Sequence, residues 1–577
     1  MRDDLNSLLS LSLSLSLFFS LSLSLSLSLS LSLSLSLSLS LSLSLSLSLS
    51  LSLSLSLSLS LSLSLSLSLS LSLSLSLSLS LSLSLSLFLS QQLSKTQYLV
   101  NATLPTGVPL AGYNHGARRV PDWPVPQNTK YTAFMTPSEG HLDPTWMRAL
   151  VIDTGKTRLA LCAHLHFVCV CVCVCVCVCV CVCVCVCVCV CVCVCVSYFV
   201  TVDAIGADGN LRKLCLDKAQ AQGAKVTTEN MMLHASHTHS GPGAVSPEYV
   251  WSLAPATDVM VPELQAMVAE SCAQAIIEAE KNLQDATIGV GHAELYNVTV
   301  NRRAKISPYV EPDSIDPHLG IIRIDDAQGN AMATVWNFAI HGTCWGPDQM
   351  LSNADIMGGV NTLLEQDADI GYALFINADA GDIDPSPESC NNKPNYDGAK
   401  IIADAVKKAR SEIQSGDIEL EMASSVKSFG LTNLNFTLAR FENCTSGGPL
   451  DICTLCEILK CDINAHLNGG WLENEPRFTA LRFTNSSGYT TLMVTLPGEA
   501  LSALGTQVRG DGLKLGFDDV FLLGYSQNHM GYFCTPEEYD IGGYESQLTF
   551  WGYNTSSLVR EGAYAAASAL APSTLFL

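Results

Sequence analysis

Basic residues are scarce in this chain, since 30 Lys and Arg stand against 53 Asp and Glu for a formal net charge of −23. Nucleic-acid-binding proteins neutralise phosphates with clustered Lys and Arg, so this balance argues against a nucleic-acid partner. Residues 9–90 do not supply the run of about 20 predominantly apolar residues that a membrane-spanning helix needs, because every second residue there is Ser. Its N-terminus, MRDDLNSLLS, has one Arg, two Asp and no clear cleavage site, so we identify no secretory signal there.

Two repeats make up a large part of the sequence. Residues 9–90 alternate Leu and Ser, broken only by Phe, and residues 168–196 alternate Val and Cys. A dinucleotide repeat read in triplets gives two alternating codons, so we interpret both tracts as translated microsatellites. The alternative, a long Leu/Ser strand, would aggregate if it were exposed. We therefore expect residues 1–96 to be unstructured and residues 97–577 to form a domain that the Val-Cys repeat interrupts.

Of the 24 Cys, 14 lie in the Val-Cys repeat, and the ten that remain are an ordinary number for a chain of this size. Four others crowd into residues 441–461, where a CxxC pair favours a disulfide-stapled loop over a zinc or redox site, since no second ligand pair follows. Six glycosylation sequons are compatible with a secreted, lumenal or cell-surface protein. They begin at Asn101, Asn297, Asn435, Asn443, Asn485 and Asn554.

The rest of the chain alternates strand-like and helix-like segments. Apolar residues recur at three- and four-residue spacing over 261–281 and 397–413, which predicts helices. Interspersed strands and helices indicate an α/β domain with a mixed or largely parallel sheet and flanking helices. Runs rich in Val, Ile and Leu predict strands at residues 147–153, 157–163, 198–206, 319–325, 333–340, 372–378, 489–498 and 519–525.

Side chains able to bind metal follow several of these strands, where functional loops of α/β sheets gather. They are His237, His239, His341, Asp382, Asp384, Glu499 and Tyr532. Alternation along an extended segment would place His237 and His239 on one face. Two imidazoles and a carboxylate form a zinc-hydrolase ligand set. Spacing alone leaves open the ordinary alternative, in which each His is a hydrogen-bonded core or loop residue.

Six motifs in a fixed order carry a family resemblance. HTHSGPG at 237–243 is followed by VNRR, FAIHGT, GDIDP, LPGE and NHMGYFCTPEEYDIGGYES. In this order the chain resembles the neutral/alkaline non-lysosomal ceramidases, zinc-dependent amidases that split ceramide into sphingosine and a fatty acid. PLAGY at 109–113, RALVID at 148–153 and VDAIG at 202–206 extend the similarity. The resemblance implies one large catalytic domain and a lipid substrate, and makes a membrane surface a possible partner.

Carried over by position, the resemblance also implies the site residues. One zinc ion per chain would have four ligands, His237, His341, Glu499 and Tyr532. Three further residues would surround the reacting carbonyl, namely His239, Arg302 and Tyr544. These types suit the chemistry, because a tetrahedral oxyanion needs preorganised donors and a leaving amine needs a proton.

The chain departs from the family pattern at two places. Asp384 of GDIDP stands where family members have a serine, and an ionised carboxylate cannot donate a hydrogen bond. It could act as a base, bind a cationic or hydroxylated substrate group, or be a turn residue. Only 33 residues follow Tyr544, so we expect no C-terminal immunoglobulin-like domain. Two alternatives therefore stay open: a hydrolase of another amide or ester, and a catalytically dead secreted binding protein.

Overall fold

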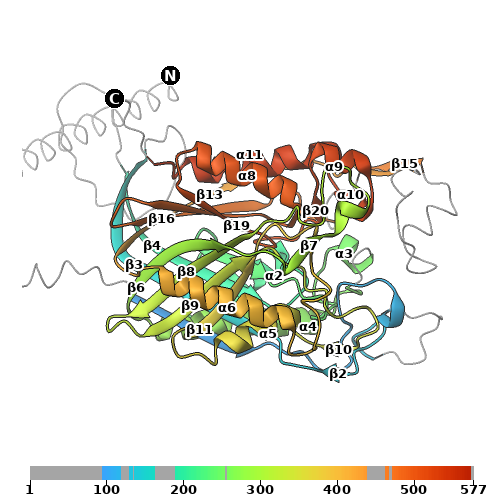
Figure 1. Ribbon diagram of the computed structural model, residues 1–577, viewed down its shortest axis with the longest axis horizontal. Helices are drawn as coiled ribbons and strands as arrows, with labels where there is room; N and C mark the ends of the chain where they lie inside the picture. Colours follow the sequence, from blue (N-terminus) through green and yellow to red (C-terminus); the bar gives the residue numbers. More distant parts are fainter. Residues whose placement is uncertain are drawn as a thin grey trace, which may run out of the picture. The chain divides into compact units, whose positions relative to one another are not determined.

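Two β-sheets pack face to face between layers of helices. The computed structural model describes residues 94–118, 129–133, 135–162, 189–253, 257–437, 462–466 and 471–572. These residues belong to one compact unit, Gln91–Leu577. Figure 1 shows α8 and α11 along the outer side of the smaller sheet, and α5 and α6 along the outer side of the larger one. The Leu-Ser repeat of residues 9–90 lies outside the described residues, so its predicted lack of structure stays a prediction. Strand β1 begins at Ser94, three residues before the predicted boundary at residue 97.

The larger sheet has eight strands in the order β11-β9-β8-β6-β1-β3-β4-β5. Its β11–β9 and β4–β5 pairs are parallel, and its other pairs are antiparallel. The prediction of a mixed sheet is therefore confirmed, whereas a largely parallel sheet is wrong. In chain order the strands are β1 Ser94–Asn101, β3 Trp146–Cys162, β4 Cys189–Val202, β5 Met231–Ala235, β6 Gln284–Glu294, β8 His318–Asp326, β9 Ala331–Phe338 and β11 Tyr372–Asn377.

The smaller sheet has four strands in the order β13-β16-β17-β19. They are β13 Ile418–Val426, β16 Arg477–Asn485, β17 Thr490–Thr495 and β19 Asp519–Leu523. The main helices are α2 Gly209–Ala221, α4 Pro262–Lys281, α5 Asp355–Leu364, α6 Asp397–Glu412, α8 Ser502–Lys514 and α11 Thr555–Ser568. The helices predicted at 261–281 and 397–413 are thus confirmed. Among the described residues, none of the helices combines the length and the hydrophobicity needed to cross a bilayer.

Strand alternation explains the layers. In β3, Ala149 and Val151 belong to the apolar cluster that includes residues of α2 and α4, whereas Leu150 belongs to the cluster shared with the smaller sheet. The cluster between the sheets includes Phe483 of β16 and Phe521 of β19. Burial of one such side chain contributes about 2 kcal/mol, so the stacked sheets form a rigid base for the loops at their ends.

Strands β3 and β4 are antiparallel partners, paired from Met147 with Val202 to Cys162 with Cys189. The runs predicted as strands at residues 147–153 and 157–163 form the single strand β3, and the run at 198–206 overlaps the second half of β4. The end of the repeat, Cys189–Val196, continues β4, which the sequence analysis did not expect. Residues 163–188 lie outside the described residues.

Two disulfides connect elements on the outer side of the larger sheet. Cys215 of α2 is bonded to Cys272 of α4, and Cys344 is bonded to Cys390. Cys534 is buried and free. The stapled loop predicted for residues 441–461 lies outside the described residues and stays a prediction.

Replacing Cys215 and Cys272 together by alanine is expected to destabilise the protein. The disulfide closes a loop with a sequence separation of 57 residues. Its loss should lower the free energy of unfolding by about 4 kcal/mol, because the unfolded chain regains the freedom of that loop. Urea unfolding of the wild type and the double variant measures the difference. A loss below about 1 kcal/mol would contradict the expected role of this cross-link.

Candidate metal centre

Four loops at the ends of strands bring the predicted metal ligands together. His237 lies two residues after β5, and His341 lies three residues after β9. Glu499 begins the short strand β18 Glu499–Ala500, and Tyr532 begins β20 Tyr532–Phe533. These two strands pair in parallel with Glu499 opposite Tyr532. The larger sheet therefore contributes the two histidines, and loops that follow strands of the smaller sheet contribute the other two side chains.

The backbone of HTHSGPG is not extended, so the predicted alternation there is wrong. Strand β5 ends at Ala235, and His237 has a φ of 66°, in the left-handed region. Such conformations are costly for a non-glycine residue and cluster at functional sites. A Cβ on Gly342 would lie 2.6 Å from the carbonyl oxygen of His237, so glycine lets the loop of His341 approach closely. The rings of His237 and His239 still converge, with 3.2 Å between their Nε2 atoms.

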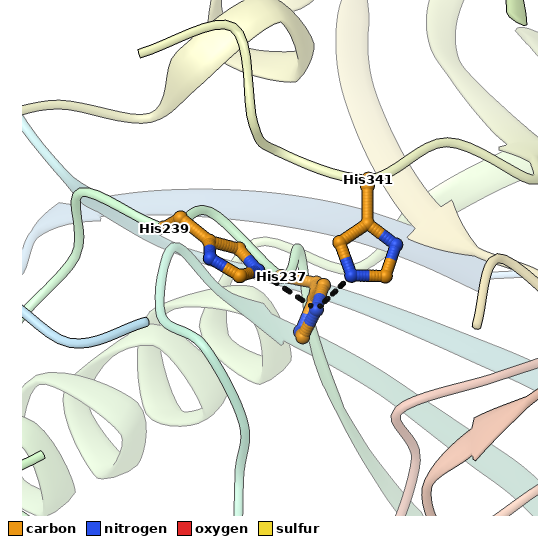
Figure 2. A group of neighbouring side chains, drawn as sticks. All are labelled: His237, His239 and His341. Carbon is orange, nitrogen blue, oxygen red and sulfur yellow. Dashed lines mark hydrogen bonds between the residues drawn. The ribbon is translucent and has the colours of Figure 1, made fainter. Parts of the chain in front are cut away.

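Three imidazoles meet in the interior, as Figure 2 shows. Nδ1 of His237 lies 2.6 Å from the carbonyl oxygen of Ile205, and Nδ1 of His341 lies 2.6 Å from that of Ala380. A carbonyl oxygen only accepts, so each Nδ1 carries its ring's N–H, and a neutral imidazole has no other. The Nε2 atoms of the two rings, 3.0 Å apart, therefore present lone pairs to each other. Two facing lone pairs at this distance call for a cation between them.

A carboxylate completes this set of donors. Oε2 of Glu499 lies 3.1 Å from Nε2 of His237 and 3.5 Å from Nε2 of His341. This buried oxygen has no hydrogen-bond partner among the described residues. Burial, and next the charge of Arg302, lowers the pKa of His341 well below its usual value.

This donor set fits a zinc ion. Neutral imidazole nitrogens and a carboxylate are zinc ligands, and each imidazole donates its Nδ1–H to a backbone carbonyl, as metal-bound histidines usually do. The fourth predicted ligand, Tyr532, is buried opposite Glu499. Burial, and next the charge of Glu499, raises the pKa of the Tyr532 phenol well above its usual range. Ionisation of this phenol therefore requires positive charge close to its oxygen.

Arg302 supplies such positive charge. Its Nη2 donates to the hydroxyl oxygen of Tyr532 at 3.1 Å, its Nη1 to Oδ1 of Asp384 at 3.1 Å, and its Nε to Oε1 of Glu545 at 2.7 Å. Arg302 begins the 3-10 helix η2 Arg302–Lys305. Asp384 lies on β12 Ile383–Pro385, which pairs with β7 Thr299–Asn301 just before Arg302. Asp384 is thus an ion-pair partner of Arg302, and its side chain is 31% exposed.

Tyr544 and His239 each adjoin a predicted metal ligand. The Tyr544 ring lies 5.4 Å from the Tyr532 ring, centroid to centroid, and Tyr544 is 43% exposed. Burial, and next His237, lowers the pKa of His239 well below its usual value, so this ring is neutral. The structure therefore connects all eight predicted site residues through contacts with one another. Their roles in binding and catalysis stay predictions.

Sequence reasoning missed three residues that contact the site. The Tyr113 ring lies 4.9 Å from that of His239, and buried Arg118 donates to the backbone carbonyl of His239 at 3.0 Å. His529 lies against Glu499. PLAGY and NHMGYF, which include Tyr113 and His529, were among the motifs of the resemblance, but a motif does not show which side chain faces the site.

Asp382 has a structural role instead. Its Oδ1 accepts from the backbone N–H of Ser502 at 2.8 Å, at the start of α8, and its Oδ2 accepts from Nδ2 of Asn301 at 2.8 Å. Burial raises the pKa of Asp382 to about 6. Its carboxylate therefore holds the loop after β11 to α8.

A second cluster of metal-binding types lies elsewhere, formed by His292, His318 and Asp519. Nδ1 of His292 lies 2.8 Å from one Asp519 oxygen, and Nε2 of His318 lies 3.0 Å from the other. Each nitrogen thus faces its own acceptor, so ordinary N–H donation explains the cluster. The buried Nδ1 of His318 has no hydrogen-bond partner among the described residues, unlike the oriented rings of most metal-bound histidines. We therefore assign this cluster as a hydrogen-bonded carboxylate.

Comparison with known proteins agrees with this arrangement. The family model of neutral/alkaline non-lysosomal ceramidase, N-terminal, matches residues 195–443. Neutral ceramidase A of Dictyostelium discoideum is 28% identical over 191 residues, 29% of this chain and 26% of the relative. Neutral ceramidase of Pseudomonas aeruginosa is 29% identical over 166 residues, 27% of this chain and 24% of the relative. These alignments span only about a quarter of the relatives' length.

Solved structures are similar over much more of the chain. The crystal structure of neutral ceramidase from Pseudomonas aeruginosa matches with a TM-score of 0.62 and 19% identity, over 83% of this chain and 74% of that chain. A ceramidase complexed with C2 matches with a TM-score of 0.62 and 18% identity, over 83% of this chain and 75% of that one. This likeness confirms the mixed α/β fold. The resemblance seen in the motifs is confirmed by the family model and the relatives together.

Proposed function

We propose that this chain, whose residues 195–443 match the family model of neutral/alkaline non-lysosomal ceramidase, is a zinc-dependent amidase that hydrolyses ceramide to sphingosine and a free fatty acid. The observation that supports this most is the convergence of two imidazole lone pairs and a carboxylate oxygen within 3.0 to 3.5 Å. Zinc held there by His237, His341, Glu499 and Tyr532 would lower the pKa of a bound water toward about 7 and so supply a nucleophile at neutral pH.

The chain's own groups would do the remaining work. Arg302 donates to the Tyr532 oxygen, and this favours the ionised phenol that a metal ligand must be. The hydroxyl of Tyr544, whose ring lies beside that of Tyr532, could donate to the oxygen of the reacting carbonyl. Neutral His239 has an Nε2 next to the metal-facing nitrogen of His237, where it could accept and return a proton during loss of the amine.

The proposal is tested by incubating the purified full chain with a fluorescent N-acylsphingosine in detergent. Release of the labelled fatty acid, and its loss after treatment with a zinc chelator, is the expected result. Zinc bound in about one equivalent without release of fatty acid would favour a hydrolase of another amide or ester. Less than about a tenth of an equivalent of zinc would favour the non-catalytic alternative.

Changing Asp384 to serine is expected to raise kcat/KM for N-acylsphingosine about fivefold. A hydroxyl can donate to an oxyanion, whereas the ionised carboxylate cannot, and one net hydrogen bond is worth about 1 kcal/mol. Steady-state kinetics measure the change, with Asp384→Ala as the control that removes the carboxylate without adding a donor. Equal values for the wild type and both variants would contradict this expectation and leave Asp384 as an ion-pair partner of Arg302 without an effect on the rate.

We also propose a secreted, lumenal or cell-surface location and contact with lipid surfaces. The disulfides Cys215–Cys272 and Cys344–Cys390 support this location, because such bonds persist in oxidising compartments. The glycosylation sequons agree with it. Fractionation of cells that express the chain, with glycosidase treatment of the product, tests both points.

A further inference from the structure

His529 faces the oxygen of Glu499 that does not approach the histidine pair. Nε2 of His529 lies 3.4 Å from Oε1 of Glu499. The other oxygen, Oε2, lies 3.1 Å from Nε2 of His237. Oε2 of this carboxylate thus faces the candidate metal position, and Oε1 faces His529.

The His529 ring is held firmly in this place. It is 3% exposed, and its centroid lies 4.4 Å from that of the Trp251 ring. A Cβ on Gly206 would lie 2.6 Å from Cγ of His529, so the absence of a side chain at Gly206 makes room for the ring. The backbone N–H of His529 donates to the side-chain oxygen of Asn528 at 2.8 Å. Packing therefore fixes the ring beside the carboxylate.

This ring has no other assigned use. Neither of its nitrogens has a partner in full hydrogen-bond geometry among the described residues. A buried imidazole has lost its hydrogen bonds to water, which costs free energy unless a protein group replaces them. We therefore expect the N–H of His529 to donate to the nearest acceptor. That acceptor is Oε1 of Glu499, 3.4 Å from Nε2 of His529.

We propose that His529 is a positioning residue, whose Nε2–H holds Oε1 of Glu499 so that Oε2 alone is presented to zinc. This inference rests on the zinc site of the proposed function. Without that donor, the carboxylate could rotate and share both oxygens between metal and water. Loss of an outer partner of a metal ligand typically lowers metal affinity by about 10- to 100-fold.

The test compares His529→Gln with His529→Met in the full chain. The two side chains have similar length and volume, but only glutamine carries an N–H donor. The dissociation constant for zinc is measured by competition with a chromogenic chelator. We expect the methionine variant to bind zinc about 10- to 100-fold more weakly than the wild type, and the glutamine variant to recover most of this loss.

Two results would overturn the inference: a methionine variant with wild-type affinity, or a glutamine variant as weak as the methionine one. Urea unfolding of the chelator-treated proteins separates the effect on metal from the effect on folding. If the methionine variant does not fold, His529→Phe replaces it in the same comparison. The readout needs no substrate, so a wild type that binds zinc but releases no fatty acid defeats the proposed function and not this inference. A wild type that binds no zinc defeats both.

Discussion

Changing His237 to alanine is expected to abolish both zinc binding and amide hydrolysis. His237 is the centre of the donor set, because its Nε2 lies within 3.2 Å of His239, His341 and Glu499. Its removal takes away the ligand to which both His341 and Glu499 are close and leaves an incomplete set of His341, Glu499 and Tyr532. Zinc content should fall from about one to below about a tenth per chain, and the rate at least a thousandfold, roughly 4 kcal/mol of barrier, since metal catalysis contributes several kcal/mol.

The matched control for this experiment is His292→Ala. His292 is also a histidine beside a carboxylate, with its side chain 38% exposed and its Nδ1 2.8 Å from Asp519. Its cluster is explained by hydrogen bonds, so this variant should keep zinc and activity near the wild-type values. Metal analysis by mass spectrometry and the fluorescent assay measure both proteins. Full zinc content in His237→Ala, or loss of zinc in His292→Ala, would contradict the assignment of the metal centre.

Local sequence patterns predicted where the strands lie, but not whether neighbouring strands pair in parallel or antiparallel. The run at residues 319–325 lies within β8, and that at 333–340 overlaps β9, because Val, Ile and Leu fit a buried pleated surface. Periodicity carries no information on which strands become neighbours. The short turn between β8 and β9 makes that pair antiparallel. Most other pairs in this sheet are antiparallel too, so the sheet is mixed rather than largely parallel.

Helix α8 shows another limit of pattern reading. It spans Ser502–Lys514 and includes Gly505, Gly510 and Gly512, each of which lowers helix propensity. The structure explains two of them, since a Cβ on Gly505 would clash with the side chain of Asp379, and a Cβ on Gly512 would lie 2.8 Å from the side chain of Val520 in β19. Close packing on the sheet thus stabilises a helix that local preference does not favour.

The candidate site was predictable in its residue types, because each lies directly after a strand or within a motif of fixed order. Its geometry was not predictable in the same way. The left-handed His237 brings three imidazoles together, and spacing suggested an extended segment instead. His529 was overlooked because its function depends on a contact with Glu499, which is 30 positions away in sequence and meets it through the β18–β20 pairing.

Arg303, next to the candidate site, is the residue whose loss should most reduce stability. Its side chain is 1% exposed, and its Nε donates to Oε2 of Glu538 at 2.5 Å. Its Nη1 donates to Oε2 of Glu545 at 2.7 Å, and both terminal nitrogens donate to the carbonyl oxygen of Gly542. One guanidinium thus neutralises two buried carboxylates and satisfies the loop that leads to Tyr544.

Changing Arg303 to methionine keeps much of the side-chain volume but leaves Glu538 and Glu545 without this partner. Breaking a buried ion pair in this way costs about 3 to 5 kcal/mol, so urea unfolding should show a loss of that size in the free energy of unfolding. The control is Lys213→Met, which removes an exposed pair with Asp217 and should change the free energy of unfolding by less than about 0.5 kcal/mol. Because Glu545 also accepts from Arg302, the folded fraction of Arg303→Met should hydrolyse substrate more slowly than the wild type. If both variants lost the same free energy of unfolding, the buried ion pairs of Arg303 would stabilise the fold no more than an exposed pair does, and the prediction would be wrong.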